Sequence, residues 1–513
     1  MRSFISPGKI ILSGILLIGL LFAGILIIAM DSNVWVPPGS ELNKSQATIS
    51  QLAAASESTS IPTQILPILT PTPDAPRTLP PLRTDTEQYF VQPNDSLHNI
   101  ARNYSVSVEA LLTANEINQP DFLEVGQELT IPAPQPQGAA TDFKVIPDSE
   151  LVYSPGSIDF QLAEFVHQQN GYLSSYTEEV DERQMSGVKI IQRIAEEFSI
   201  NPRLLLAVLE YQGGWVRNPE PEAETLDYPI GVAVEWRKGL YNQMAWAADN
   251  LNRGYYLWRV NGVPIWILSE GTILSIDPSI NAGTAGVQHF FSQLYDGVEW
   301  ERAVSPEGLF SIYNELFGYP FQKSFDPILP DGMLQPAMRL PFEDGQAWSY
   351  TGGPHGGWGS GSAWAALDFA PPGEALGCVT SDAWVVAVAE GMILRAENGA
   401  VIQDLDNDGL EQTGWSVLYM HIDTRDRVRA GTILPAGGRI GHPSCEGGFS
   451  SGTHLHLARR YNGEWISADQ DIPFNLDGWT TVGLGYEYDG YLIKDGQTVE
   501  AWDGREAINE IKR

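Results

Sequence analysis

The spacing of hydrophobic residues divides the chain into regions of different predicted structure. Residues 10–30 form a run of 21 positions without a charged residue. As a helix that rises about 1.5 Å per residue, this run can cross the roughly 30 Å hydrocarbon core of a bilayer. Arg2 and Lys9 precede it and Asp31 follows, which favours an exported remainder. We therefore expect residues 1–30 to be an uncleaved transmembrane anchor; a cleaved signal peptide is the alternative.

The next region has no hydrophobic periodicity. Residues 31–86 are rich in Ser, Thr and Pro, which predicts an extended linker. Residues 87–132 instead begin and end with short strand-like runs, and two helical patterns lie between them. Asp95 or Ser96 is expected to cap the first of these helices. This pattern predicts a small βααβ domain, followed by a second linker over residues 133–149.

Two larger regions complete the chain. Residues 150–327 show the spacing of amphipathic helices, for example over residues 188–194. Residues 328–480 change to short β-type runs between turns rich in Gly and Asp, which predicts an antiparallel β domain. Residues 481–513 are taken as a C-terminal extension.

Net charge narrows the range of partners. The chain has 64 Asp and Glu residues against 30 Lys and Arg residues, a formal net charge of −34. Phosphate recognition needs a cationic surface. The composition therefore argues against nucleic acid as a partner.

The small βααβ unit resembles a LysM domain. The resemblance rests on Asp-Ser-Leu at 95–97, Ile-Ala at 100–101 and the ending VGQELTIP at 125–132. It implies binding to glycan that contains N-acetylglucosamine, in a groove between two turns of the domain. The residues placed at that groove are Asn94, Asp95, Ser96 and Asn115.

The helical region resembles lysozyme-like transglycosylases, in which a helix ending in Ala-Val-Ile-x-x-Glu-Ser delivers the general acid. Here Gln212 and Gly213 occupy the Glu-Ser positions, and Glu210 comes two residues earlier. Two residues are about 200° of rotation on a helix, so Glu210 should face away from the family's site. Because Gln cannot donate a proton to a glycosidic oxygen, we expect an inactive domain; Glu210 as a real catalytic acid is the alternative.

The β region holds histidines that can act together. His454 and His456 lie at i and i+2, so in a strand their side chains share one face, about 6–7 Å apart, while Leu455 and Leu457 face the core. That separation suits a metal ligand beside a catalytic base. Two surface histidines on a strand are the alternative. His421 likewise stands between two apolar residues, Met420 and Ile422, in a second predicted strand.

These residues resemble the lysostaphin-like (LytM-type) zinc endopeptidases of cell-wall peptide. Most members use His-x-x-x-Asp for the first two ligands, but here Trp364 stands four residues before Asp368. His355, thirteen residues before Asp368, fits the β-lytic branch, in which a glycine-rich loop supplies the first ligand. The resemblance implies one Zn²⁺ with the ligands His355, Asp368 and His456, catalytic roles for His421 and His454, and a disulfide between Cys378 and Cys445.

An acidic turn raises a second metal question. Asp404, Asp406 and Asp408, followed by Gly409, have the spacing of a Ca²⁺-binding loop, yet Trp415 stands where a full loop has its Glu. Ca²⁺ binding and a plain acidic hairpin turn both remain open.

Together these patterns predict a single-pass protein of the cytoplasmic membrane whose exported part is a zinc metalloendopeptidase acting on peptidoglycan peptides. Its LysM domain would hold it on glycan strands and raise the local substrate concentration. One alternative is a non-catalytic wall-binding or regulatory protein whose zinc site has decayed, but all five site positions are filled. The other is a glycan-cleaving transglycosylase acting through the helical domain, which Gln212 argues against.

Overall fold

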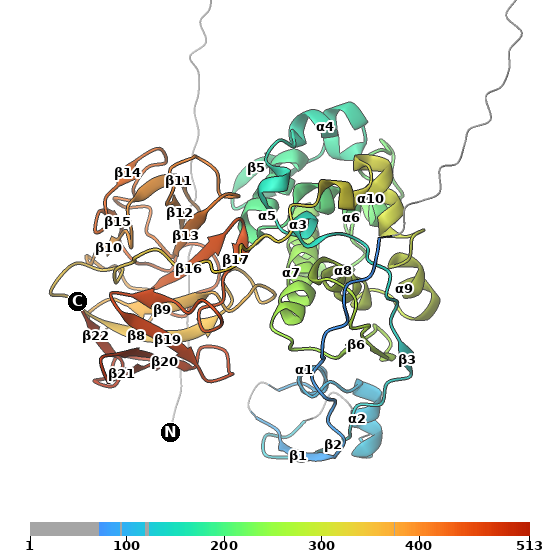
Figure 1. The fold of residues 1–513 in the computed structure, drawn as a ribbon, viewed down its shortest axis with the longest axis horizontal. Helices are drawn as coiled ribbons and strands as arrows, with labels where there is room; N and C mark the ends of the chain where they lie inside the picture. Colours follow the sequence, from blue (N-terminus) through green and yellow to red (C-terminus); the bar gives the residue numbers. More distant parts are fainter. Residues whose placement is uncertain (1–70, 93–94, 118–122, 374) are drawn as a thin grey trace, which may run out of the picture. The chain divides into compact units, whose positions relative to one another are not determined.

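The computed structural model describes residues 71–92, 95–117, 123–373 and 375–513 (Figure 1). The predicted transmembrane segment, residues 10–30, lies outside them. No helix within the described part of the chain is long and apolar enough to cross a membrane. The described residues belong to one compact unit of the chain.

The structure confirms the predicted order strand, helix, helix, strand in the first domain. Its elements are β1 (Glu87–Phe90), α1 (Leu97–Asn103), α2 (Val108–Ala114) and β2 (Glu128–Ile131). β1 and β2 pair antiparallel and so join the two ends of the domain. Ser96 caps α1, where its hydroxyl accepts a hydrogen bond from the Asn99 N–H at 3.1 Å. Leu111, Leu129 and Ile131 are fully buried in the small core between strands and helices.

The helical region forms its own layered core. Its helices are α3 (Asp148–Leu151), α4 (Leu162–Gln169), α5 (Gly187–Phe198), α6 (Pro202–Gly213), α7 (Leu240–Arg259), α8 (Ala282–Ser292), α9 (Gly297–Ala303) and α10 (Leu309–Phe317). Its strands are β3 (Gly138–Ala139), β4 (Thr177–Val180), β5 (Arg183–Ser186), β6 (Ile265–Ile267) and β7 (Ile273–Ser275). α7 and α8 approach closely at Gly286, where a Cβ atom would lie 2.7 Å from the Leu251 carbonyl oxygen. Only glycine permits that approach.

Parts of both predicted linkers belong to this helical region. β3 pairs parallel with β7, and Val145 and Ile146 are fully buried. Asp74 donates its backbone N–H to the Ser279 carbonyl at 2.8 Å and pairs with Lys144 at 2.7 Å. The linker prediction is therefore wrong for these residues. Extended segments can bury single apolar side chains without any periodicity, so the hydrophobic pattern does not reveal them.

The β region is antiparallel, as predicted. Its main strands are β8 (Ala347–His355), β9 (Ala366–Ala370), β11 (Gly391–Glu397), β12 (Ala400–Asp404), β13 (Trp415–Met420), β14 (Ile433–Leu434), β16 (Leu455–Tyr461), β17 (Glu464–Trp465) and β22 (Glu510–Lys512). They form one sheet in the order β14-β11-β12-β13-β16-β9-β8-β22, with β17 paired to β16. A four-stranded sheet contains β18 (Asn475–Leu476), β19 (Trp479–Gly483), β20 (Gly490–Lys494) and β21 (Gln497–Glu500), and β10 (Val385–Val386) pairs with β15 (Arg439–Gly441).

Residues 481–513 are part of the β region and not a separate extension. They supply β20 and β21, and β22 pairs with β8 at the edge of the main sheet. The predicted boundary at residue 480 is therefore wrong. It cuts through β19, whose alternation continues across it.

The two faces of the main sheet contact different neighbours. Leu455 and Leu457 of β16 belong to a core inside the β region, whereas Ala458 and Ala366 belong to the core of the helical region. Successive strand residues alternate between faces. One face of the sheet is therefore buried within the β domain, and the other lies toward the helical region.

Candidate metal centre

The three predicted zinc ligands lie on three neighbouring strands. His456 of β16 is directly opposite Asp368 of β9, and Asp368 is opposite Gly352 of β8. Directly opposed residues share a face, which here is the face that lies toward the helical region.

His355 reaches the same face because β8 is irregular. The register shifts between Gly352 and His355, so that His355 is opposite Ala366. In a regular strand, an odd offset of three residues would turn His355 to the other face. The extra residue of the bulge restores the site face. His355 is therefore the last residue of a strand. The resemblance had implied that it lies in a glycine-rich loop, but the glycine-rich segment follows it.

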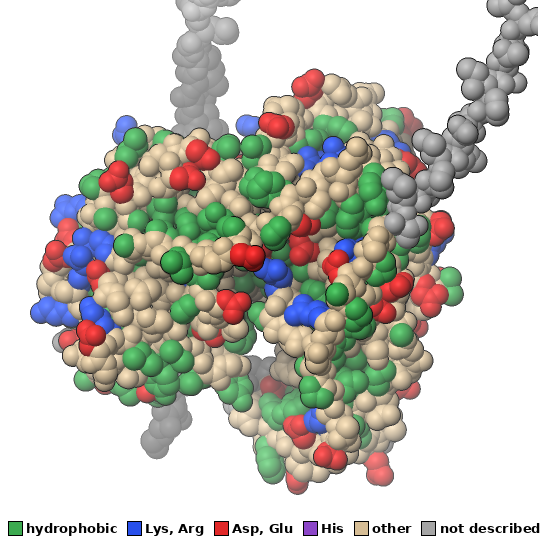
Figure 2. Space-filling view, in the orientation of Figure 1, with side chains coloured by type: hydrophobic (Ala, Val, Ile, Leu, Met, Phe, Trp, Pro, Cys, Tyr) green, Lys and Arg blue, Asp and Glu red, His purple; other side chains and the backbone are tan. Residues whose placement is uncertain are grey.

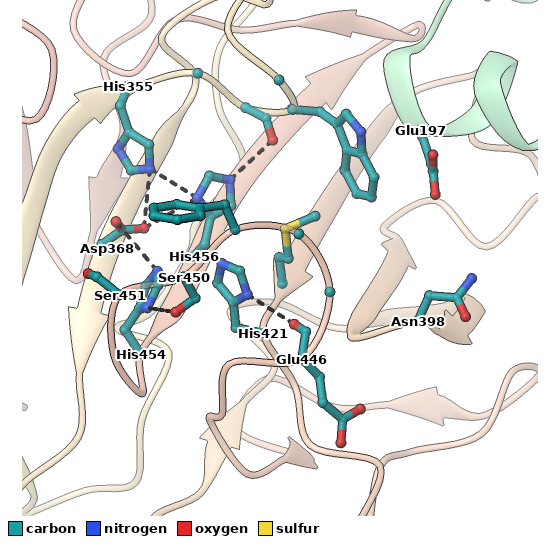
Figure 3. A pocket seen from close by; sticks show the side chains of 18 of the residues that line it. Glu197, His355, Asp368, Asn398, His421, Glu446, Ser450, Ser451, His454 and His456 are labelled. Atoms are coloured by element: carbon teal, nitrogen blue, oxygen red, sulfur yellow. Dashed lines mark hydrogen bonds and ion pairs between the residues drawn. The ribbon is translucent and has the colours of Figure 1, made fainter. Parts of the chain in front are cut away.

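The ligand atoms form a small triangle (Figure 3). His355 Nε2 lies 2.9 Å from His456 Nδ1 and 3.2 Å from Asp368 Oδ1, and His456 Nδ1 lies 3.3 Å from the same oxygen. With zinc bonds of about 2.0–2.1 Å, tetrahedral ligand atoms are about 3.3 Å apart. Asp368 Oδ1 is buried and has no hydrogen-bond partner among the described residues. The donor set and this orphaned oxygen fit a zinc ion.

Backbone carbonyls fix which nitrogen of each imidazole faces the centre. His355 Nδ1 bonds the Gly353 carbonyl at 2.8 Å, which leaves Nε2 inward. His456 has the opposite arrangement, with Nε2 on the Gly357 carbonyl at 3.1 Å and Nδ1 inward. Such outer contacts orient metal-binding histidines.

The two predicted catalytic histidines flank this triangle. His421 Nδ1 bonds the Glu446 carbonyl at 2.9 Å, and His454 Nδ1 bonds the Gly452 carbonyl at 2.7 Å. Their ring centroids are 4.5 Å apart, and His454 Nε2 lies 3.6 Å from Asp368 Oδ2. His421 directly follows β13 with φ of 66°. A non-glycine residue at positive φ is uncommon and often marks a functional position.

Burial and neighbouring charge shift the pKa values of these groups in different directions. Burial and the nearby His454 and His456 lower the pKa of His421 to about 3, so its imidazole is neutral at neutral pH. Burial opposes ionisation of Asp368, but His355 and His454 outweigh it and hold the carboxyl pKa well below its usual range. Burial also opposes a charge on His355, yet Asp368 raises its pKa.

The predicted disulfide is confirmed. Cys378 and Cys445 are bonded, with their Cα atoms 5.7 Å apart. The bond joins the segment after β9 to the loop before β16. Beside it, the Thr453 N–H donates to the Gly377 carbonyl at 3.0 Å, so the bridge lies next to the start of β16, which carries His456 and directly follows His454.

Tyr488 is a further residue of the site that no motif in the sequence indicated. Its ring stacks on His355 at a centroid distance of 4.3 Å, and its carbonyl accepts a hydrogen bond from the Gly353 N–H at 2.7 Å. Like His421, it has a positive φ, of 70°. The only sequence signal was a cluster of aromatic and glycine residues, GYEYDGY, in the segment taken as an extension.

The site opens into a cavity of about 950 Å³. The β region lines it with the site residues, the glycine-rich segment and the loop at 446–451. The helical region lines it with Asp181, Arg193, Glu197 and Tyr241. Figure 3 shows Glu197 entering from the helical side, while the Glu446 carboxylate is directed away from the histidines.

The residues placed at the LysM groove are largely engaged within the domain. Asn94 lies outside the described residues. Asp95 accepts hydrogen bonds from the Tyr89 hydroxyl and the Gln92 N–H, at 2.6 and 2.7 Å. The Asn115 side chain bonds both backbone groups of Thr130, and Ser96 caps α1. Glycan contact at these positions stays a prediction.

The acidic turn brings its aspartates together. Asp404, Asp406 and Asp408 offer ligand atoms within 4.8 Å of one another. Burial and the neighbouring Asp404 raise the pKa of Asp406 to about 6. Asp404 accepts hydrogen bonds from the Asp406 and Gly409 N–H groups, at 3.1 and 3.0 Å, as in an ordinary turn. Ca²⁺ binding stays a prediction.

Glu210 and Gln212, the two residues compared with a catalytic acid, both lie on α6. Glu210 accepts a hydrogen bond from the Val216 N–H and pairs with Arg217 at 2.7 Å. Gln212 accepts a hydrogen bond from the Tyr295 hydroxyl. Glu210 thus has structural partners, and Gln212 has one through its oxygen, while its buried Nε2 has none among the described residues.

Comparisons with known families and proteins agree with this organisation. The LysM domain matches residues 89–132, and the N-terminal domain of LasA matches residues 144–329. The latter is the region whose sequence resembles lysozyme-like enzymes, a likeness that stays a prediction. Protease LasA of Pseudomonas aeruginosa is 27% identical over 291 residues, which cover 53% of this chain and 65% of LasA. The chain thus spans just under two thirds of that relative's length.

Beta-lytic metalloendopeptidase of Lysobacter enzymogenes is 28% identical over 175 residues, which cover 33% of this chain and 92% of the relative. Among solved structures, the M23 metalloprotease pseudoalterin from the deep sea is 26% identical, covers 35% of this chain and 99% of its own, and has a TM-score of 0.29. The catalytic domain of lysostaphin from Staphylococcus simulans is 25% identical, covers 25% and 89%, and has a TM-score of 0.17. The chain is thus similar to the LysM domain over residues 89–132, to the N-terminal domain of LasA over residues 144–329 and, over part of its length, to LasA and beta-lytic metalloendopeptidase.

Proposed function

We propose that this protein is a zinc metalloendopeptidase that hydrolyses peptide bonds of bacterial peptidoglycan. The observation that carries the proposal is the triangle of His355 Nε2, Asp368 Oδ1 and His456 Nδ1, in which the buried oxygen faces the two imidazole nitrogens at 3.2 and 3.3 Å. Three protein ligands with space beside them are typical of a catalytic zinc site, not a structural one. The names of the LasA and beta-lytic relatives support proteolysis.

The residues beside the triangle match the needs of peptide hydrolysis. Bound zinc would supply Lewis-acid activation of a water molecule and of the peptide carbonyl. His421 holds its Nδ1 proton on the Glu446 carbonyl and is neutral, so its Nε2 can accept a proton and return it to the leaving amine. His454 is held in the same way and presents Nε2 beside Asp368, where it can orient the reacting groups or donate to the oxyanion. Either histidine can serve in either role.

The proposal is tested on purified peptidoglycan sacculi. The full-length protein should release new amino groups and no new reducing ends, and EDTA should abolish the release. His355→Ala should lose both zinc, measured by elemental analysis, and hydrolysis. His167→Ala, on the helical region away from the site, is the matched control and should retain both. Full activity of His355→Ala, or new reducing ends without new amino groups, would refute the proposal.

We further propose that residues 10–30 anchor the protein in the cytoplasmic membrane and that the LysM domain holds it on glycan. Support comes from the uncharged run and from the LysM match. Cell fractionation should find the protein in the membrane fraction. A variant that lacks residues 10–30 should be absent from the membrane fraction. Equal release of both forms would contradict anchoring.

A further inference from the structure

A second cavity, of about 560 Å³, adjoins the metal centre within the β region. It shares Asp368, His454 and Tyr488 with the larger cavity, so the two cavities meet at the metal site. All of the residues that line the second cavity belong to the β region. A peptide bound across the metal centre would therefore place the residues on one side of the cleaved bond in this cavity.

Arg505 is the one Lys or Arg side chain among the described residues that line the second cavity. It is half-buried, and its guanidinium donates from Nε to the Pro371 carbonyl at 2.9 Å and from Nη1 to the Ala375 carbonyl at 3.0 Å. A guanidinium has five N–H donors, so further donors stay free to bind a ligand. Asp503 lines the same cavity, but the described part of the chain contains no ion pair of Arg505.

The backbone around Arg505 is fixed to the strand that carries His355. The buried Asn509 donates through its side-chain amide to the carbonyls of Gly504 and Tyr350, at 2.8 and 3.2 Å. Tyr350 and His355 both belong to β8. The carbonyls that hold the guanidinium follow β9, which supplies another metal ligand. Arg505 therefore has a fixed position relative to the metal centre.

We propose that Arg505 forms a subsite for a carboxylate of the peptide substrate, in the second cavity beside the metal centre. The subsite rests on the proposed peptidase function. A carboxylate can accept two parallel N–H donors from a guanidinium, which gives the contact a defined geometry as well as energy. Because two backbone carbonyls already orient Arg505, its side chain loses little freedom when the carboxylate binds.

The test compares untreated sacculi with sacculi whose free carboxylates have been converted to amides. The wild-type protein should cleave the untreated material about fivefold faster, the factor that corresponds to about 1 kcal/mol. Arg505→Gln should cleave both materials at the rate at which the wild type cleaves the amidated one. Mass spectrometry of the fragments that the wild type releases faster would tell a side-chain carboxylate from a chain terminus.

Arg429→Gln is the matched control. Arg429 is an exposed residue of the β region that lines neither cavity, and its replacement changes the net charge by the same amount. This variant should keep the wild-type preference. A second measurement needs no variant, because about 1 M salt screens ion pairs and should reduce the preference of the wild-type protein.

Three results would overturn the subsite. One is equal cleavage of both materials by the wild type, and another is a preference that high salt leaves unchanged. The third is an Arg505→Gln variant that slows on both materials by the same factor and keeps the preference, since that shows a structural role alone. If the wild type cleaves neither material, the peptidase proposal itself fails and the subsite with it.

Discussion

At the scale of single residues, the site depends on side chains that are held by their own backbone. Each site histidine gives one ring nitrogen to a carbonyl, and only the other faces the centre. His355 has an additional contact, because Tyr488 stacks on its face. A ring packed against a ligand restricts its rotation, which lowers the entropy lost when the metal binds.

Tyr488→Ala should therefore weaken zinc binding about tenfold, as outer contacts of metal ligands typically do. Tyr488→Phe keeps the ring and should bind zinc like the wild type. Competition with a fluorescent chelator measures both affinities. Equal affinities of Tyr488→Ala and the wild type would show that the stacking does not position His355.

At the scale of elements, the strand pairing decides which side chains meet. β8, β9 and β16 lie side by side and supply one ligand each, and the bulge in β8 sets the face of His355. The start of β16 is tied to the segment after β9 by the disulfide. This bond closes a loop over a sequence separation of 67 residues.

Replacing both Cys378 and Cys445 by Ser should lower the free energy of unfolding by about 2–5 kcal/mol, because the unfolded chain regains the freedom of a long loop. Denaturant titration gives the value. A reductant should destabilise the wild type by a similar amount and leave the double variant unchanged. A double variant as stable as the oxidised wild type would contradict a stabilising role.

At the scale of the whole described molecule, charged side chains are buried where the helical and β regions meet. The acidic side chains on the outside are spread over the face seen in Figure 2. At the buried boundary, Glu464 of β17 pairs with Arg259 of α7 at 2.9 Å, and its second oxygen has no partner among the described residues. Burial, partly opposed by Arg259, raises the pKa of Glu464 to about 7.

A carboxyl group whose pKa is raised by folding stabilises the protein when it is protonated. Its contribution is complete below the unfolded pKa of about 4.5 and is lost as the pH rises through about 7. Between pH 4.5 and 8 the loss should reach about 3 kcal/mol in the wild type. Glu464→Gln, which resembles the protonated form, should lack this component. Thermal melting of both proteins across this range measures the difference, and parallel curves would contradict it.

Several features could be predicted from residues alone. The His454-x-His456 pair, the capping Ser96 and the antiparallel β domain follow from local chemistry and from the two-residue period of strands. The integrated position of residues 138–149 and 481–513 could not be predicted, because their partners lie far away in the sequence. Tyr488 is such a case, since its contact with His355 exists only once β20 and β8 are placed together.

The sequence by itself determined the kind of chemistry, because the donor atoms belong to the residue types, and the order of domains, because periodicity is local. The tertiary structure decided the rest. It placed His355 on the site face through a bulge, put Asp368 Oδ1 beside two imidazole nitrogens at the centre, and put α5 and α7 over the cavity. These outcomes depend on strand register and on packing between distant segments, and neither is written in the spacing of residues along one chain.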